Sequence, residues 1–344
     1  MEGITGNESG ILAETASICD ELGLQTDVSP AGIILRAFEK NSGPSLLFCS
    51  HLDTVPAGIG WTVPPFKATF ADSHLFGRGA VDARGSCAAI IMTAAHYASI
   101  KQARGQFIGI LSIGEEGNKP SLPILLEKVT PVDAGIVGEP TSMKIVTAQR
   151  GLMVLELSAQ GKQGHASRAS DSNSILTLAH DLIVLEALKW LRPHRTLGAV
   201  KITPTRLQAG VADNVAPPLA AAVLDLRTTP SYTHKEILAI VRSVVRSELR
   251  VIEDQWIPCE TPENHPLVIA AKEALGESTV TVSYAASDWV FLHQQGIPAI
   301  MVGPGNPAYS HAPDERISID ELEAGVRGYI RIAETLWNRF GAGS

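Results

Sequence analysis

Residues 45–53 read SLLFCSHLD and place a histidine and an aspartate directly after an apolar run. The run from Leu46 to Phe48 is too short for a helix and predicts a buried strand, so His51 and Asp53 lie at its carboxyl end. The spacing of two puts both side chains on one side of the strand. His51 could give one ring nitrogen to a metal while a nearby carboxylate holds the other. The pair alone is more typical of a solvated loop, so the metal interpretation needs support from other residues.

Three more segments of the sequence deliver acidic residues after a predicted element. Asp82 lies in a glycine-rich turn that enters a long apolar helix. Glu115 and Glu116 follow an apolar run at residues 107–113, and Glu139 follows a second such run. In an open α/β sheet, ligands bind beyond the carboxyl ends of the strands. Random placement would scatter these residues over both edges, so the repetition predicts a functional site at one edge.

The number and types of these residues suit two metal ions. Two divalent ions ~3.5–4 Å apart need a bridging carboxylate and about two further ligands each. Five residues supply that count: His51, Asp82, Glu116, Glu139 and His311. Glu115 is then left beside a ligand, where it could take the proton of a metal-bound water. The alternatives are a solvated acidic loop for the Glu-Glu pair and a helix-entry acid for Glu139.

The elements that must position these residues fall into two parts. In the first, we expect helices near residues 11–22, 266–275 and from 319, and a glycine-rich turn that enters a long helix within 75–98. We also expect strands at 32–38, 107–113, 134–137, 280–283 and 299–302, and an ordered loop at 56–76. The second part, residues 151–256, has a β-α-β-β-α-β order. That order predicts an antiparallel sheet covered on one face by two helices. We therefore expect a discontinuous catalytic domain, 1–150 and 257–344, with a separate domain inserted at 151–256.

Composition limits the functional classes. The 344 residues are enough for two domains with full cores, and the net charge is −8 with no Lys/Arg block. A nucleic-acid or anionic-membrane partner is therefore not expected. The four cysteines are scattered without CxxC spacing, which favours reduced thiols. With no signal-peptide pattern and no run of ~20 apolar residues, we expect a cytoplasmic protein.

Five ordered motifs carry a family resemblance: HLDTVP, GRGAVDARG, GEEG, GEPT and SHAPDE. Together with GKQGHAS, ADNVAPP and DLR, they resemble the M20 family of metallopeptidases and deacylases across nearly the whole chain. Within it, the branch of acetylornithine deacetylase and succinyl-diaminopimelate desuccinylase is most similar. The resemblance implies a zinc-peptidase-like α/β catalytic domain with a mixed central sheet flanked by helices. It also implies that the inserted domain is an α+β, ferredoxin-like lid and dimerisation domain.

The resemblance also assigns roles to individual residues. It implies two Zn²⁺, with Co²⁺ or Mn²⁺ as substitutes, bridged by Asp82, and a cis peptide bond after that residue. His51 and Glu139 would complete one site, and Glu116 and His311 the other. Glu115 matches the general base and Asp53 the carboxylate behind His51. His165 matches a histidine that stabilises the oxyanion, often from the partner subunit of a homodimer. Substrate-binding positions are implied for four residues: Asn214, Arg227, Ser287 and Asp288.

For two of these residues another interpretation is open, and for a third the resemblance suggests a preference. His165 lies in a Gly/Ser-rich turn where a solvated histidine is common, and Arg227 could form a surface ion pair at a strand end. Asp288 could favour a cationic side chain such as that of ornithine. The seven other histidines have no motif support and are expected to be structural or exposed: His74, His96, His180, His194, His234, His265 and His293.

The expected activity is metal-assisted hydrolysis that removes an N-acyl group from a small-molecule N-acyl amino acid, as in acetylornithine deacetylase. Glu115 would take a proton from the attacking water and return it to the leaving amine. Alternatives within the family are a succinyl-diaminopimelate desuccinylase and a di- or carboxypeptidase. A hydrolase acting on carrier-protein-linked lysine or ornithine would need a basic docking patch, and none stands out. A non-catalytic binding module would be expected to lose Glu115 or a ligand, and none is lost.

One departure from the family pattern concerns the N-terminus. Members usually have a further helix before the segment that resembles ITGNES, and here Met1 precedes that segment directly. This difference bears on N-terminal packing and not on the expected metal site.

Overall fold

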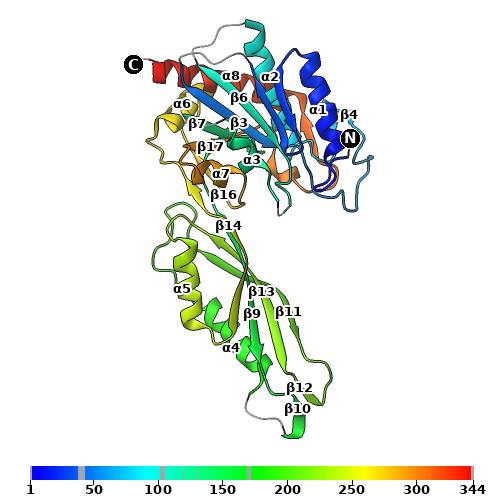
Figure 1. Cartoon of the computed structure of the whole chain (residues 1–344), viewed down its shortest axis with the longest axis vertical. Coiled ribbons are helices and arrows are strands. Elements are labelled where there is room, and N and C mark those ends of the chain that lie inside the picture. Colours follow the sequence, from blue (N-terminus) through cyan, green and yellow to red (C-terminus); the bar gives the residue numbers. More distant parts are fainter. Residues whose placement is uncertain are drawn as a thin grey trace. The chain divides into compact units, whose positions relative to one another are not determined.

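The computed structural model describes residues 2–37, 43–100, 105–117, 119–129, 131–168 and 172–341. The chain divides into two compact units (Figure 1). The first unit comprises residues 1–147, 261–281 and 291–344, and the second comprises residues 148–260 and 282–290. The division places the short segment 282–290 with the second unit, whereas the sequence analysis put it in the catalytic domain. The part of the expected strand and turn at residues 38–42 lies outside the described residues.

The first unit is built on a mixed sheet. Its strands follow the order β1-β2-β6-β3-β7-β17-β8. Strands β6, β3, β7 and β17 are parallel, and β1, β2 and β8 run antiparallel to their neighbours. The bounds of these strands are β1 Gln25–Ser29, β2 Gly32–Arg36, β3 Ser45–His51, β6 Gln106–Ser112, β7 Ala134–Val137, β8 Val146–Gln149 and β17 Ala299–Met301. The expected α/β fold with a mixed central sheet is confirmed.

Helices cover the sheet of the first unit (Figure 1). Their bounds are α1 Ser9–Glu21, α2 Arg84–Ile100, α3 Leu122–Leu126, α6 Pro266–Leu275, α7 Trp289–Gln294 and α8 Ile319–Gly341. The core joins β3 to the C-terminal helix, because the ring of Phe48 lies 5.2 Å from that of Tyr329 between centroids. Tyr97 of α2 meets Trp337 of α8 at 5.0 Å. Every residue of β3 is buried, which fixes the strand end that carries His51.

The loop expected at 56–76 contains a hairpin that the sequence analysis did not predict. Strands β4 Thr69–Ala71 and β5 His74–Phe76 pair antiparallel, and β18 Arg316–Ser318 joins β5 to complete a small sheet. Strands of three residues are too short to show an alternation of apolar and polar residues. This small sheet places the segment after His311 beside the segment before Asp82.

The second unit has the antiparallel sheet expected from its element order. The sheet order is β11-β13-β9-β14, with neighbours antiparallel throughout. Its elements are β9 Gly151–Gln160, α4 Ser174–Glu186, β11 Lys201–Ala209, β13 Leu219–Thr228, α5 His234–Val244 and β14 Glu248–Trp256. Burial alternates along β9, so one face packs in a core with Leu178 of α4 and Ile237 of α5. Both helices therefore cover the same face.

Four further strands are short. β10 Gly164–His165 pairs antiparallel with β12 Val215–Ala216. β15 Cys259–Glu260 pairs with the end of β8, and β16 Thr281–Ser283 also pairs with β8. The four cysteines of the chain all lie in the described part, are buried, and form no disulfide.

Candidate metal centre

His51 occupies the carboxyl end of β3, between the parallel strands β6 and β7. Its side chain is 1% exposed, and Nε2 lies 3.3 Å from Oδ1 of Asp82. The other ring nitrogen, Nδ1, lies 3.1 Å from the backbone oxygen of Asp53 and 3.5 Å from its carboxylate. The backbone carbonyl is thus the nearer partner of Nδ1, and it favours the tautomer that leaves Nε2 available to a metal.

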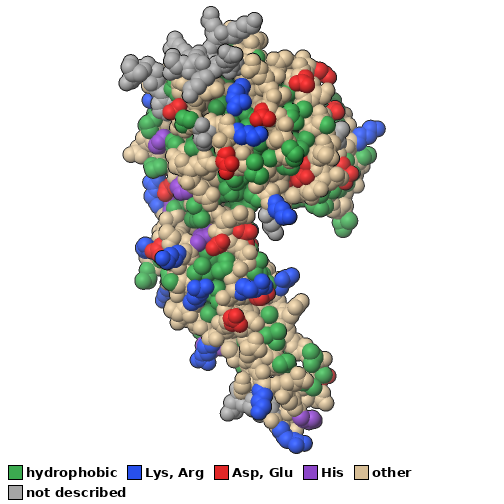
Figure 2. All heavy atoms as spheres, in the orientation of Figure 1, with side chains coloured by type: hydrophobic (Ala, Val, Ile, Leu, Met, Phe, Trp, Pro, Cys, Tyr) green, Lys and Arg blue, Asp and Glu red, His purple; other side chains and the backbone are tan. Residues whose placement is uncertain are grey.

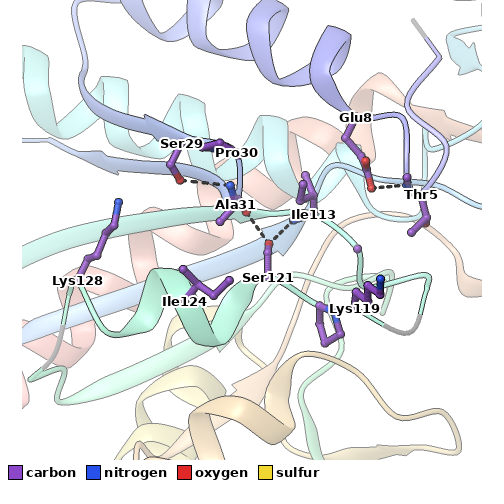
Figure 3. A pocket seen from close by; sticks show the side chains of 13 residues that line it. Thr5, Glu8, Ser29, Pro30, Ala31, Ile113, Lys119, Ser121, Ile124 and Lys128 are labelled. Atoms are coloured by element: carbon purple, nitrogen blue, oxygen red, sulfur yellow. Dashed lines mark hydrogen bonds between the residues drawn. The ribbon is translucent and has the colours of Figure 1, made fainter.

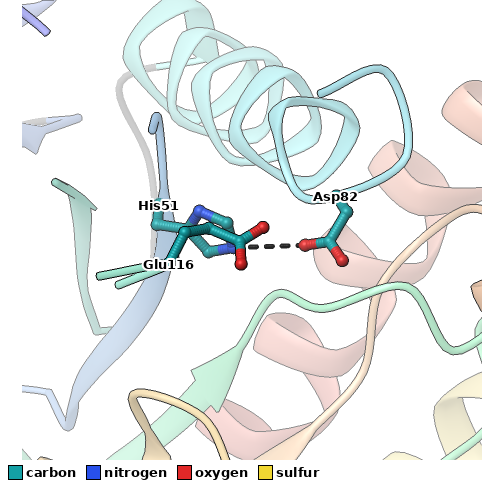
Figure 4. Close-up of side chains that lie close together, drawn as sticks. All are labelled: His51, Asp82 and Glu116. Atoms are coloured by element: carbon teal, nitrogen blue, oxygen red, sulfur yellow. Dashed lines mark ion pairs between the residues drawn. The ribbon is translucent and has the colours of Figure 1, made fainter. Parts of the chain in front are cut away.

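Asp82 lies between two imidazoles. Its Oδ1 faces Nε2 of His51 at 3.3 Å, and its Oδ2 faces Nε2 of His311 at 3.5 Å. His51, Asp82 and Glu116 each offer a ligand atom, and the three atoms lie within 4.8 Å of one another (Figure 4). The peptide bond between Asp82 and Ala83 is cis, as the resemblance implied. A carboxylate that directs each oxygen toward a different imidazole fits a bridge between two ions.

The other acids divide between these two imidazoles. Glu139 follows β7 and comes within 3.8 Å of Nε2 of His51, and Glu115 comes within 3.9 Å of the same atom. Glu116 instead contacts Nε2 of His311 at 2.9 Å. The structure thus brings together all five expected ligands and Glu115. Of the adjacent glutamates, Glu115 comes within 3.9 Å of His51, whereas Glu116 contacts His311 and also has a ligand atom within 4.8 Å of those of His51 and Asp82.

The carboxylates of this cluster favour positive charge on the two imidazoles, as the pKa shifts of its side chains show. Burial alone would lower the pKa of His51, but the surrounding carboxylates outweigh it and raise that pKa well above its usual value. Glu116 is the main cause of a raised pKa at His311. Burial would raise the pKa of Asp82, yet the two imidazoles lower it. Imidazole and carboxylate are the donors that a divalent zinc site uses, so the donor set fits such an ion.

Asp53 has a wider role than the sequence suggested. Its carboxylate is fully buried and accepts hydrogen bonds from the backbone N–H of Glu115 at 3.2 Å and of Glu116 at 3.1 Å. The hydroxyl of Thr5 donates to the same carboxylate at 2.6 Å. One side chain therefore fixes the backbone of both glutamates. Thr5 was missed because its partner is 48 residues away in the sequence.

A cavity of about 800 Å³ lies next to Thr5 (Figure 3). Its walls come from the N-terminal segment, the β1–β2 turn and the segment around α3, and they include Gly114 beside the glutamate pair. None of the five expected ligands lines it. The cavity is therefore separate from the cluster of His51 and Asp82.

In the second unit, two residues implied for substrate contact come together. The pairing of β10 with β12 sets His165 opposite Val215, and the N–H of Ala166 donates to the backbone oxygen of Asn214 at 2.9 Å. Both His165 and Asn214 are exposed. The ring of His165 is held locally by Ser167, whose hydroxyl lies 2.8 Å from Nδ1.

Arg227 and Ser287, also implied for substrate binding, make contacts within the second unit. Arg227, near the end of β13, forms a two-point ion pair with Asp225, with Nε to Oδ1 at 2.9 Å and Nη2 to Oδ2 at 3.1 Å. Ser287 and Asp288 are 3% and 1% exposed. The hydroxyl of Ser287 donates to Oε1 of Gln149 at 2.7 Å. A contact of these two residues with substrate stays a prediction.

Three of the histidines without motif support make contacts that stabilise the fold. His265 caps α6 by accepting the N–H of Leu267, and His194 lies 3.3 Å from Glu260. His234 is buried between Thr228 and the backbone oxygen of Asp254.

Comparison with known proteins places the chain in a family. Residues 47–335 match the peptidase family M20/M25/M40, and the chain belongs to that family. A probable carboxypeptidase of Aspergillus flavus is 30% identical over 322 residues, covering 85% of this chain and 75% of the relative. A probable carboxypeptidase of Aspergillus oryzae matches to the same extent.

Solved structures show the same fold at low identity. An M20 family metallo-carboxypeptidase from Sulfolobus solfataricus aligns with a TM-score of 0.78 and 19% identity, covering 97% of this chain and 96% of that one. A dinuclear metal binding peptidase of the M20 family from Bacillus subtilis aligns with a TM-score of 0.74 and 17% identity, covering 98% and 94%. The chain is thus an M20-family hydrolase. In the described part of the chain, no helix is long and apolar enough to cross a membrane.

Proposed function

We propose that this protein is a two-metal amidohydrolase that frees an amino acid from an acyl group on its nitrogen. The observation that carries the proposal is the placement of Asp82, whose two oxygens face two different imidazoles at 3.3 and 3.5 Å. His51, Asp82 and Glu139 would hold one ion, and Asp82, Glu116 and His311 the other. Two such ions, Zn²⁺ with Co²⁺ or Mn²⁺ as substitutes, supply polarisation of the scissile carbonyl and a water of lowered pKa.

Glu115 is the residue that moves the proton. It lies 3.9 Å from Nε2 of His51, at the same imidazole as Glu139, and its backbone is fixed by Asp53. A carboxylate held there can accept a proton from the attacking water and pass it to the nitrogen that leaves. His165 is the proposed oxyanion donor, and one well-placed donor contributes roughly 3 kcal/mol to the transition state. Asn214 and Arg227 are proposed to bind substrate.

The preferred substrate is an N-acyl amino acid, by similarity of the motifs to the acetylornithine deacetylase branch. A carboxypeptidase is the second candidate, because the relatives at 30% identity are named probable carboxypeptidases. Both reactions cleave an amide beside an amino acid that keeps its carboxylate. Rates on N-acetyl-ornithine, N-succinyl-diaminopimelate, dipeptides and longer peptides, each compared with its C-terminal amide, would decide between them. Cleavage of none of these by a metal-loaded sample would contradict the proposed function.

A further measurement bears on the proposal. Elemental analysis should find about two divalent ions per chain, and an active protein without metal would contradict the site. On the face drawn in Figure 2, Lys and Arg side chains lie among Asp and Glu side chains.

We also infer a homodimer formed through the second unit. The edge strand β11 is exposed along most of its length, and Leu176 and Ile183 of α4 are 67% and 66% exposed. An open edge strand beside apolar side chains suits pairing with a second copy. Light scattering should give twice the chain mass. A monomer at micromolar concentration would contradict it.

A further inference from the structure

A buried ion pair joins two loops of the first unit that carry proposed ligands. Nη1 of Arg78 lies 2.6 Å from Oε2 of Glu315, and the two side chains are 2% and 0% exposed. Arg78 is four residues before Asp82, and Glu315 is four residues after His311. The pair therefore ties together segments that are 237 residues apart in the sequence.

The second oxygen of Glu315 holds the backbone at Asp82. Oε1 accepts the N–H of Val81 at 2.8 Å and the N–H of Asp82 at 3.0 Å. These hydrogen bonds to a charged acceptor are stronger than those between neutral groups. The orientation of the proposed bridging carboxylate therefore depends on Glu315.

The second nitrogen of Arg78 holds the backbone at His311. Nη2 donates to the backbone oxygen of His311 at 3.3 Å and to that of Ala57 at 3.0 Å. His311 has a φ of 61°, in the left-handed region that residues other than glycine seldom adopt. Such a conformation persists only when surrounding contacts enforce it. Arg78 supplies one of these contacts.

We propose that the Arg78–Glu315 pair is a positioning element for the ion that Asp82, Glu116 and His311 would share. This inference relies on the two-metal site of the proposed function. Beyond their ion pair, the hydrogen bonds of these two side chains go to backbone groups of Ala57, Val81, Asp82 and His311, so the pair acts through the backbone and is not catalytic. A buried ion pair adds little net stability compared with apolar residues of the same size. We therefore expect the pair to fix the geometry of the loops more than the stability of the fold, because one planar guanidinium donates to three acceptors on two loops.

Two single substitutions test the role. Glu315→Gln keeps the shape but removes the charge that faces Arg78, and Arg78→Lys keeps the charge but cannot bridge the same acceptors. Metal-free protein is titrated with Zn²⁺ by calorimetry, with a competing chelator for the tighter site. Outer-shell substitutions typically lower metal affinity 10–100-fold. We expect the larger loss at the site that Glu116 and His311 complete, and a smaller loss at the other site because Asp82 is shared by both. Glu323→Gln, which breaks the exposed pair with Arg327, is the matched control and should change neither.

A further comparison separates positioning from folding. Arg78→Met with Glu315→Leu removes both charges and can recover thermal stability, but it leaves the N–H groups of Val81 and Asp82 without their acceptor. Leu336→Ala, in the buried part of α8, lowers stability away from the site. In the double variant the inference expects weaker zinc binding, most of all at the site with His311, even if its Tm is normal. In Leu336→Ala it expects two normal affinities at a lowered Tm.

The outcomes distinguish the inference from the proposed function. If wild-type protein binds two ions and the Arg78 and Glu315 variants bind both with unchanged affinity, the positioning role is overturned and the two-metal function stands. If metal affinity falls in proportion to Tm in every variant, Leu336→Ala included, the pair is only structural. If wild-type protein binds fewer than two ions, the proposed function fails and the inference fails with it.

Discussion

The two units fix their candidate residues in different ways. In the first, the expected ligands follow buried strands or loops whose backbone is held by charged side chains such as Asp53 and Glu315. In the second, His165 lies on a two-residue ladder, Asn214 directly precedes the partner strand, and both side chains are exposed. The first arrangement is completed within one unit, whereas the second leaves two functional groups facing solvent. The proposed metal ligands and proton acceptor thus lie in the first unit, whereas His165 and Asn214, proposed for oxyanion and substrate contact, lie in the second.

The largest expected effect separates Glu115 from Glu116. Glu115→Gln should keep both ions and lower kcat by about 10²–10⁴-fold, because it removes only the proton acceptor. Glu116→Gln should instead weaken one ion, with partial recovery in added zinc. Metal content and kcat measured on both variants decide the assignment. Loss of metal from Glu115→Gln with full retention in Glu116→Gln would reverse the two roles.

His165→Ala tests the second unit against the first. It should lower kcat by roughly 10²–10³-fold, as loss of an oxyanion donor does, with metal content unchanged. His180→Ala, at an exposed histidine of the same unit, is the control. If His165 acts in the partner subunit, mixed dimers of His165→Ala and Glu115→Gln chains should regain part of the activity. No gain in mixed dimers that are shown to form would place its action within one chain.

A smaller effect is expected from Thr5→Val. The substitution removes the hydroxyl that donates to Asp53 at 2.6 Å and leaves the size of the side chain similar. Asp53 would keep its bonds to the glutamate backbone, so zinc affinity should fall by about tenfold, the low end for outer-shell residues. Thr69→Val on the exposed β4 strand should leave the affinity unchanged. An equal change in both variants would remove Thr5 from the site.

The smallest expected effect is on the pH dependence of the stability of the second unit. Burial lowers the pKa of His234, so the neutral form is favoured in the folded state. Stability is then fully present above the unfolded pKa of ~6.5 and is lost as pH falls toward the lower folded value, by at most ~1.4 kcal/mol per pH unit. Hydrogen exchange of the β9 and β13 amides, compared at pH 7 and below pH 6.5, measures this loss of stability. His234→Gln should flatten the dependence, and an unchanged slope would exclude His234 as its source.

Much of the fold follows from local sequence. Helix α6 has the predicted bounds because Pro266 starts it and Gly276, with φ of 69°, ends it. The strand Ala134–Val137 also has its predicted bounds, since a short apolar run is bounded by polar residues. Strands β1, β4, β5 and β8 were missed. β1 and β4 are the first strands of short hairpins, and β5 and β8 pair with the distant strands β18 and β17. The M20 family was predicted correctly, and the deacetylase branch remains a proposal.

The ligands could be proposed from residue type and order, but their support could not. Asp53 was expected behind His51, yet its bonds to the backbone of Glu115 and Glu116 join residues 62 and 63 positions apart. Arg78 and Glu315 offered only one signal, a charged residue inside each of the motifs GRGAVDARG and SHAPDE. Such contacts are set by the packing of loops and leave no periodic pattern in the sequence.

The division of the chain has a consequence for the order in which the protein is made. The four main strands of the second unit are complete once Trp256 has been synthesised, whereas the first unit lacks α8 until the last residues emerge. Phe48 has no Tyr329 to pack against during most of translation. We therefore expect the central part of the chain to resist protease on the ribosome before the N-terminal part does, although it is made later. Proteolysis of nascent chains stalled after residue 290 would show whether the second unit is protected first.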